Sequence, residues 1–308
     1  MRILVFEFMV GGGVADQHPL SDELQTFYQQ GHSMLKAVCE DLLLLEHEVV
    51  TLVDINANVS LPSEVVRISA ERQADLDPTL LAAAIDADRI LLIAPETDGC
   101  LEHFANLLSS FANRFSGPNI GFIRLTADKF KCHGWYSQRG VPCPETFLFR
   151  ESDDLPENFL PCVAKPVDGA GSENVRLISS AAELNDFSAP VLIQKYVAGI
   201  AVSVSVIVES SEMVHFLEPG QQVFDAEPFG VHLRTEFPLE PDLRERAVKL
   251  ARLVVDASPN AVGYFGIDMV LAEDVANDVV IEINPRLTTS YYFLREWSKE
   301  NLAEKFPL

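Results

Sequence analysis

The sequence predicts an α/β domain followed by an α+β region built on antiparallel sheet. From residue 1 to about 115, apolar strands alternate with helical segments, a pattern typical of a parallel sheet with helices on its faces. Beyond residue 140, strand candidates follow one another, and several alternate apolar with small or polar residues, which favours antiparallel pairing. The chain has 308 residues, enough for two or three subdomains that share large cores.

The composition excludes two classes of function. Acidic residues outnumber basic ones by 46 to 23, and the net charge of −23 argues against general binding of nucleic acid or of an anionic membrane. No apolar run approaches a membrane span, and Glu7 interrupts the first apolar segment too early for a signal peptide. We therefore expect a soluble, cytoplasmic protein that acts on small molecules. The five scattered cysteines contain no CxxC pair and indicate reduced thiols without a zinc site. The oligomeric state stays open, a homodimer included.

The N-terminal region carries polar residues where its strands end. We expect strands over 3–6, 48–53 and 89–94, and helices over 33–45 and 101–115. Ligands of parallel sheets bind beyond the carboxyl ends of the strands, where Glu7, the 11–13 glycines and the 95–98 turn lie. Glu7 could hold a substrate ammonium, and an ordinary loop carboxylate is an equal alternative. The glycines lack GxGxxG spacing, so a flexible loop is favoured over a dinucleotide site.

A lysine and a loop of small residues mark the middle of the chain. We expect a helix that is capped by Thr126, has Asp128 in its first turn and ends near Arg139. Lys165 lies within a short apolar strand and therefore needs a partner. The loop after it, Asp168–Ser172, could wrap its backbone N–H groups around phosphate oxygens, with an ordinary glycine-rich hairpin as the alternative. Further strands are expected over 147–149, 174–178 and 191–197.

Two strands near the C-terminus carry oxygen ligands. The segments 263–270 and 279–284 are separated by a gap that suits a hairpin, in which Asp268 stands across from Glu282. Facing carboxylates destabilise a sheet unless a cation lies between them. Glu282 and Asn284 share one face of their strand, and such oxygen donors suit Mg²⁺. A solvated sheet face is the alternative.

The same strand is expected to turn Ile281 and Ile283 toward a core and Val280 away from it. The remaining elements expected in this region are strands over 200–208 and 212–218 and helices over 243–255 and 292–306.

Five motifs occur in one order along the chain: Asp128-Lys129, Lys165 with its glycine loop, Gln194 to Val197, Asp268, and Glu282 to Arg286. In this order they resemble the ATP-grasp superfamily of carboxylate–amine ligases, over essentially the whole chain. The resemblance implies the ATP-grasp fold, in which an α/β pre-grasp domain comes first, a small lid subdomain second and an antiparallel domain for metal and substrate last. The corresponding ranges are 1–118, 119–197 and 198–308.

The resemblance also implies a role for each motif. The ligands of the ATP phosphates would be Lys129, Lys165, Gly169, Gly171 and Ser172. The strand whose backbone binds adenine would be Gln194, Lys195, Tyr196 and Val197, although the family commonly has an acid where Gln194 stands. Mg²⁺, or Mn²⁺ in its place, would be bound by Asp268, Glu282 and Asn284. The catalytic residues would be Arg286 and Lys165, which stabilise the transferring phosphoryl group. The alternatives are a solvent-facing lysine for Lys129 and a surface salt bridge for Arg286.

A site of this kind activates a carboxylate. Transfer of the γ-phosphate of ATP makes an acyl phosphate that an amine can attack, so no nucleophilic side chain is required. A narrower resemblance, to the tyramine–glutamate ligases of methanofuran biosynthesis, is carried by Phe6-Glu7-Phe8 with Gly11-Gly12 and by the segments 31–35, 165–169 and 284–291. It implies that the γ-carboxylate of glutamate is joined to tyramine or a tyrosine-like amine. The alternatives are a dipeptide or D-alanine–D-alanine-like ligase and a nucleotide-binding protein without catalysis.

The residues that select the substrates are indicated less directly. The candidates are Glu7, Arg234, Thr288, Thr289 and Ser290. Either threonine could instead cap the last helix. Arg234 could equally be a surface charge.

Overall fold

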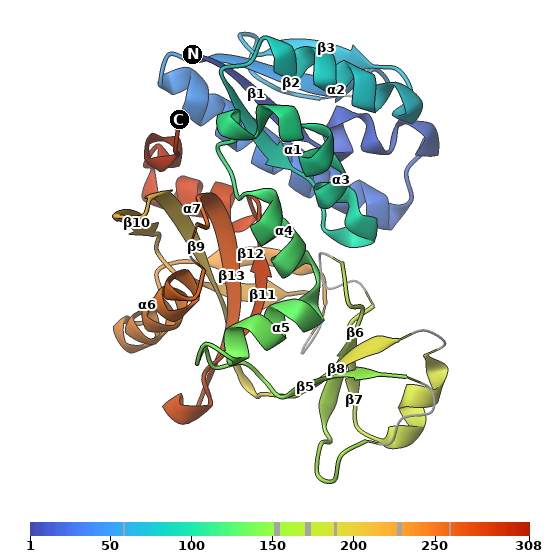
Figure 1. Ribbon diagram of the computed structural model, residues 1–308, viewed down its shortest axis with the longest axis vertical. Coiled ribbons are helices and arrows are strands. Elements are labelled where there is room, and N and C mark those ends of the chain that lie inside the picture. The colour runs from blue at the N-terminus through green and yellow to red at the C-terminus, as the bar shows by residue number, and fades with distance from the viewer. Residues whose placement is uncertain (58, 151–154, 170–173, 188–189, 227–229, 259) are drawn as a thin grey trace.

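The computed structural model describes residues 1–57, 59–150, 155–169, 174–187, 190–226, 230–258 and 260–308. Three sheets follow one another along its long axis (Figure 1). The predicted combination of parallel and antiparallel sheet is confirmed. Among the described residues, no helix is both long enough and apolar enough to cross a membrane. The predicted phosphate ligands Gly171 and Ser172 lie outside the described residues. The proposed division at residues 118 and 197 stays a prediction.

The first sheet is parallel, as its alternation with helices predicts. Its strands lie in the order β3-β2-β1-β4 and are β1 (Arg2–Glu7), β2 (Glu48–Asp54), β3 (Val66–Ala70) and β4 (Arg89–Ile93). Its helices are α1 (Asp22–Leu44), α2 (Leu76–Ile85) and α3 (Cys100–Leu107). Strand β3 and helix α2 were not expected from the sequence, and α1 was expected to begin at residue 33. Helix α1 begins earlier because the Ser21 side chain accepts the N–H of Leu24 as a cap.

Residues Met9–Gly13 form a buried π-helical turn between β1 and α1, where we expected a flexible loop. Gly12 has φ +108°, a backbone conformation that side chains disfavour. The glycines therefore serve a tight, buried turn directly after the first strand.

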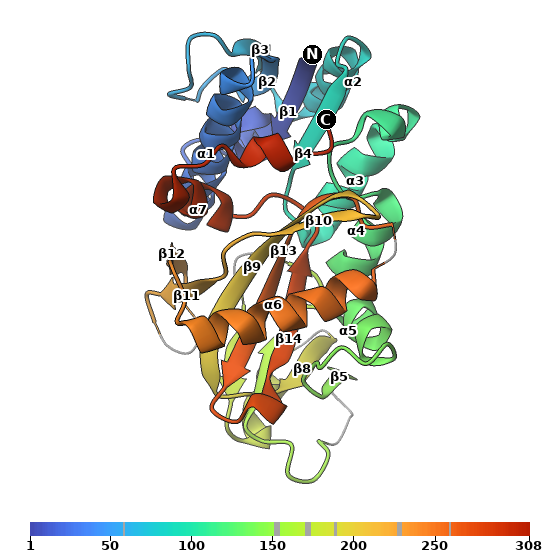
Figure 2. The ribbon, with the colours of Figure 1, turned by 90° about the vertical axis from the view of Figure 1, so that its left-hand side faces the viewer.

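The middle sheet is antiparallel, with strands in the order β12-β11-β9-β13-β14 and β10 paired to β9. Its strands are β9 (Gly199–Ser210), β10 (Met213–Phe216), β11 (Gly220–Phe224), β12 (His232–Glu236), β13 (Gly263–Ala272) and β14 (Val279–Asn284). Helix α6 (Pro241–Asp256) lies across one face (Figure 2). Its residues Ala247, Leu250 and Val254 share a core with Val204 and Phe265 of the sheet. The predicted hairpin is confirmed, since Asp268 pairs with Glu282.

One face assignment is wrong because β14 carries a β-bulge. The pairing runs Asp268 with Glu282 and then Met269 with Val280, so Ile281 is passed over. Val280 consequently packs in the core beside Ile283, whereas Ile281 lines the cleft beside Glu282. Strict alternation cannot anticipate an extra residue.

The small third sheet has the order β5-β8-β6-β7 and comprises β5 (Thr146–Phe149), β6 (Cys162–Lys165), β7 (Arg176–Ile178) and β8 (Val191–Lys195). Helices α4 (Ile120–Ala127) and α5 (Lys129–Ser137) lead into it. The expected cap at Thr126 is wrong, because Thr126 lies in α4 and donates to the carbonyl of Phe122. Asp128 caps α5 instead and accepts the N–H of Lys131.

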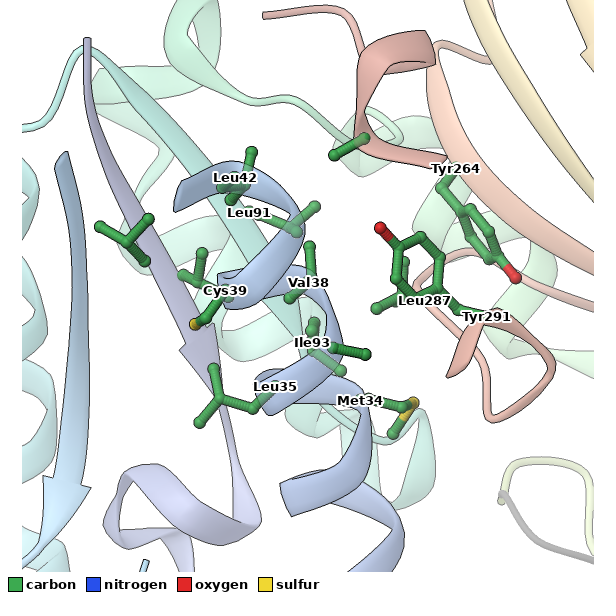
Figure 3. Close-up of a cluster of buried hydrophobic side chains, with 14 of the residues drawn as sticks. Met34, Leu35, Val38, Cys39, Leu42, Leu91, Ile93, Tyr264, Leu287 and Tyr291 are labelled. Atoms are coloured by element: carbon green, nitrogen blue, oxygen red, sulfur yellow. The ribbon is translucent and has the colours of Figure 1, made fainter. Parts of the chain in front are cut away.

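The chain ends with α7 (Ser290–Ser298), which is shorter than expected, and a 3-10 turn (Leu302–Lys305). Helix α7 lies beside α1 of the first domain (Figure 2). Tyr264 and Tyr291 share a hydrophobic core with Met34 and Val38 of α1, as Figure 3 shows. The two ends of the chain are therefore packed into one core.

Asp41 joins the same two helices through polar contacts. This buried carboxylate accepts the hydroxyl of Tyr291 at 2.6 Å and Nε of Arg295 at 2.5 Å. The side-chain amide of Asn301 donates to the Asp41 carbonyl at 2.8 Å. Residues far apart in sequence thus stabilise the contact between α1 and α7.

We expect Asp41→Asn to destabilise the protein by about 2 kcal/mol, because an amide presents one acceptor where two donors converge. The urea midpoint of unfolding measures the loss. The matched control is Glu236→Gln, which alters an exposed ion pair with Arg234 and should change stability by less than about 0.5 kcal/mol. Equal effects of the two substitutions would show that the Asp41 contacts do not stabilise the fold.

Candidate active site

A cleft of about 1270 Å³ is lined by residues from all three sheets. It opens beyond the carboxyl end of β1, over the face of the middle sheet and against the third sheet. Its lining includes most of the candidate residues, among them Glu7, Lys129, Lys165, Asp268 and Arg286. Three parts of the chain therefore contribute to one site.

Two acids face each other on the floor of the cleft. Asp268 of β13 and Glu282 of β14 are register partners. Asp268 accepts Nδ2 of Asn284 at 2.9 Å and Nε2 of Gln222 at 3.3 Å. Burial and the charge of Glu282 raise the pKa of Asp268 to about 6. A cation at this place would return Asp268 to its charged form.

Two lysines act on the charge of Glu282, and one of them contacts it. Nζ of Lys129 lies 3.1 Å from Oε1 of Glu282 and donates to the Gly169 carbonyl at 2.6 Å. Lys165 is buried, and burial lowers its pKa to about 8 against the opposing effect of Glu282. Burial alone would raise the pKa of Glu282, but Lys129 and Lys165 outweigh burial and lower it.

The donor set at this hairpin suits a divalent cation that is also bound by phosphate. Among the described residues, no three His, Cys, Asp or Glu side chains gather closely enough to hold a metal by themselves. Asp268 and Glu282 supply two carboxylates, and Asn284 can add its amide oxygen because its NH₂ group donates to Asp268. Mg²⁺ commonly binds one or two carboxylates together with substrate phosphates. The residues therefore fit such an ion.

The predicted adenine strand borders the same cleft. Gln194, Lys195, Tyr196 and Val197 all line it. The side chain of Gln194 is buried and donates to the hydroxyl of Thr146 at 3.1 Å. Lys195 donates to the carbonyls of Asn158 and Leu160. Both side chains are thus held by the protein, and the backbone N–H groups of Lys195 and Tyr196 donate to the carbonyls of Glu145 and Pro161.

Arg286 follows β14 and meets an acid from the first domain. Its Nε and Nη2 donate to Oε2 of Glu96 at 3.1 and 2.9 Å. Burial alone would lower the pKa of Arg286, and the adjacent Glu96 outweighs burial and raises it. The sequence analysis assigned no role to Glu96, although it lies in the 95–98 turn at the carboxyl end of a strand.

Glu7 is buried at the end of β1. Its Oε2 accepts the N–H of Val10 at 2.8 Å, and burial raises its pKa to about 7. Gly31 of α1 makes room for it, because a Cβ at Gly31 would lie 2.4 Å from Oε1 of Glu7. The carboxylate therefore reaches the cleft only because α1 carries a glycine there.

The residues after Arg286 have hydroxyls with partners in the sheet. Thr288 hydrogen-bonds Tyr264 at 3.0 Å, and Tyr264 hydrogen-bonds Ser205. Thr289 lies 3.3 Å from Nδ1 of His232. Ser290 lies 3.4 Å from the hydroxyl of Thr235. Thr289 occupies the cap position of α7, but its side chain makes no capping hydrogen bond.

Arg234 is the candidate that the structure places elsewhere. It does not line the cleft, and it is exposed and paired with Glu236 at 2.6 Å. Its position supports the alternative of a surface charge. Two residues that the sequence analysis did not select, Gln222 and His232, line the cleft from β11 and β12. They lie in a polar stretch without a recognisable motif.

Charge is divided between the two halves of the cleft. Among the described residues, the lysines and arginine that line it all come from beyond residue 118: Lys129, Lys165, Lys195 and Arg286. The charged residues that the first domain contributes are the acids Glu7, Glu23, Asp77 and Asp98, with His103 beside them. The part beyond residue 118 also contributes the acids Asp168, Asp268 and Glu282, so its charge is mixed, whereas the side formed by the first sheet is acidic and suits an ammonium group.

Comparison with known proteins shows similarity in sequence and in fold. The ATP-grasp domain family matches residues 126–290. Tyramine–L-glutamate ligase of Methanocaldococcus jannaschii is 25% identical over 303 residues, covering 98% of this chain and 87% of that protein. A solved Archaeoglobus fulgidus protein assigned to the ATP-grasp superfamily has a TM-score of 0.74 at 20% identity, with 96% of this chain and 84% of that one covered. D-alanine–D-alanine ligase of Bacillus anthracis, solved with ATP, has a TM-score of 0.62 at 21% identity, with 99% and 98% covered.

We expect Glu7 to make the stability of the protein fall as pH rises. Its pKa of about 7 lies above the usual 4.5, so between these values the folded state holds a proton that the unfolded state has lost. Above pH 7 the buried carboxylate then costs roughly 3 kcal/mol. Glu7→Gln keeps an acceptor for Val10 and should exceed the wild type in unfolding free energy at pH 8 but equal it at pH 4.

The matched control is Glu245→Gln, which alters an exposed side chain on α6 and should leave the pH dependence unchanged. Urea unfolding at several pH values makes the comparison. If the Glu7→Gln protein shows the same pH dependence as the wild type, folding does not shift the pKa of Glu7.

Proposed function

Because the chain belongs to the ATP-grasp family, we propose that it joins the γ-carboxylate of glutamate to the primary amine of tyramine or a tyrosine-like amine. The enzyme is an ADP-forming carboxylate–amine ligase. ATP-grasp enzymes use ATP with divalent metal ions. The product would enter the biosynthesis of a one-carbon cofactor of the methanofuran type. The observation that carries the proposal is the sequence similarity to a tyramine–L-glutamate ligase over 98% of this chain.

The lysines that line the cleft support binding of the ATP phosphates by Lys129, Lys165 and the loop that begins at Gly169. Lys129 already reaches this loop, since it donates to the Gly169 carbonyl at 2.6 Å. The backbone of Gln194 to Val197 would bind adenine. Lys165 has a pKa of about 8 and is charged in most molecules at neutral pH. A buried lysine of this kind is strongly attracted to phosphate.

Asp268, Glu282 and Asn284 would hold Mg²⁺, with Mn²⁺ as an alternative. The ion would neutralise phosphate charge and orient the γ-phosphate. The side chains themselves already lie in place, because Asn284 and Gln222 donate to Asp268. Lys129 and Lys165 hold Glu282 in its charged form.

Arg286 would stabilise charge on the γ-phosphate as it passes to the carboxylate. The carboxylate oxygen forms the new bond to phosphorus, the bond to ADP breaks, and an acyl phosphate results. The amine then attacks the acyl carbon and phosphate leaves.

The acidic half of the cleft supports entry of the amine from the first domain. Glu7, with a pKa of about 7, is suited to contact an ammonium group and to take its proton before attack. Thr288, Thr289 and Ser290 line the cleft after Arg286, and their hydroxyls would contact the glutamate that is activated there. Arg234 lies outside the cleft and has no part in this proposal.

The test is release of ADP and phosphate from Mg-ATP with glutamate and one of tyramine, tyrosine, D-alanine or water. We expect release with glutamate and tyramine or tyrosine, and a product with the mass of the amide. If D-alanine is the one amine that supports release, the enzyme is better assigned to the D-alanine–D-alanine-like ligases. No release with any pair, with Mg-ATP still bound, would refute the proposed substrates.

We expect Lys165→Ala to lower kcat/KM for ATP by about 100-fold or more, because it removes a buried positive charge from the developing phosphoryl charge. Steady-state release of ADP measures the effect. The matched control is Lys249→Ala on the exposed face of α6, which should leave the rate within about two-fold of the wild type. Wild-type activity of the Lys165→Ala protein would show that Lys165 does not contribute to phosphoryl transfer.

A further inference from the structure

The turn after β4 links the first domain to both other parts of the cleft. Oε2 of Glu96 accepts two N–H groups of Arg286, and the two side chains are only 3% and 13% exposed. The backbone N–H of Asp98 donates to Oδ2 of Asp168 at 3.0 Å, directly before the glycine loop. A turn that carries no recognisable motif thus contacts the cleft's arginine and its phosphate loop.

The contact with Glu96 determines which way the guanidinium of Arg286 faces. A guanidinium has five N–H donors in one plane. Glu96 accepts from Nε and Nη2, and the carbonyl of Leu287 accepts from Nη1 at 3.2 Å. Within the described part of the chain, the remaining two donors, one on each Nη atom, have no protein acceptor. A phosphoryl oxyanion matches a fork of this kind.

The second carboxylate oxygen of Glu96, Oε1, indicates that the pair of Glu96 and Arg286 is not optimised for stability. Oε1 of Glu96 is buried and lacks a hydrogen-bond partner among the described residues, which destabilises the folded state. Arg246 and Asp278 form a contrasting buried pair outside the cleft. There both carboxylate oxygens accept from Arg246, and one also accepts the N–H of Ala272. Glu96 is therefore satisfied only on the side that holds Arg286.

We propose that Glu96 is a positioning residue for the ligase reaction, because it holds Arg286 in the orientation that presents two N–H donors to the transferring phosphoryl group. The inference rests on the proposed function, which supplies that phosphoryl group. It makes the first domain a contributor to phosphoryl transfer as well as to amine binding. The catalytic arginine is oriented only when the turn after β4 lies against the middle sheet.

The kinetic test compares Glu96→Ala with Asp278→Ala, which removes the acid of the other buried pair. We expect Glu96→Ala to lower kcat by about 100-fold, as misplacement of a reacting group does, with KM for Mg-ATP within about three-fold of the wild type. Glu96→Gln should recover about ten-fold of the loss, because its amide oxygen can accept from Arg286. Asp278→Ala should lower Tm by about 5 °C without lowering kcat. Wild-type kcat for Glu96→Ala would overturn the proposal.

A double-mutant cycle separates positioning from an independent effect. In the Arg286→Ala protein, adding Glu96→Ala should lower kcat by less than about two-fold, since Glu96 would act through the missing arginine. If the two losses multiply instead, Glu96 acts by another route and the proposal is overturned.

An NMR measurement keeps the test independent of the substrates. In the full-length wild type, the Nε–H signal of Arg286, identified by its loss in Arg286→Lys, should exchange slowly with solvent. Glu96→Ala should increase that exchange at least ten-fold. Equal exchange in the two proteins would overturn the positioning role. If the wild type fails to couple glutamate with any amine, the proposed function falls, and this measurement still decides how Glu96 acts on Arg286.

Discussion

Two half-buried carboxylates that face each other across one hairpin impose the main constraint on this structure. Asp268 and Glu282 are register partners on neighbouring strands. Like charges at such positions destabilise a sheet, and in this site the pKa of Asp268 is raised while cations lower that of Glu282. These cations come from α5, from β6 and from the segment after β14. The two acids therefore depend on the packing of the third sheet and its leading helix against the middle sheet.

Contacts between the parts explain how the assembly is maintained. Asp41 binds Tyr291 and Arg295 at the outer end, where α1 and α7 also share a hydrophobic core. Closer to the cleft, Glu96 binds Arg286. The polar contacts are few but buried, where hydrogen bonds to charged groups stabilise most. The region of the first sheet is consequently part of the site, because Glu96 contacts Arg286 there.

Particular elements show how far the sequence could be interpreted. The strands β1, β2 and β4 of the first sheet follow from apolar runs bounded by polar residues, whereas β3 is too polar to be recognised in this way. The β13–β14 hairpin follows from two apolar strands separated by a turn. The start of α1 was missed because its first turns, Asp22 to Gln30, are largely polar. The bulge at Ile281 was missed because alternation assumes that each residue has one partner on the neighbouring strand. The sequence pattern indicates that Glu96 lies in a turn at the end of a strand, but it does not indicate that Glu96 contacts Arg286.

The sequence by itself determined the order of sheets and helices and the chemical types gathered along the chain. The segment from Glu282 to Arg286 contains a carboxylate, an amide and an arginine, which are close in sequence in any fold. Only the tertiary structure decided which side chains meet: it brought Glu96 to Arg286, set Glu7 against Gly31 and left Arg234 outside the cleft. The physical reason is that periodicity records the neighbours of a residue within one element. Contacts between elements depend on how their surfaces pack, which the local sequence does not encode.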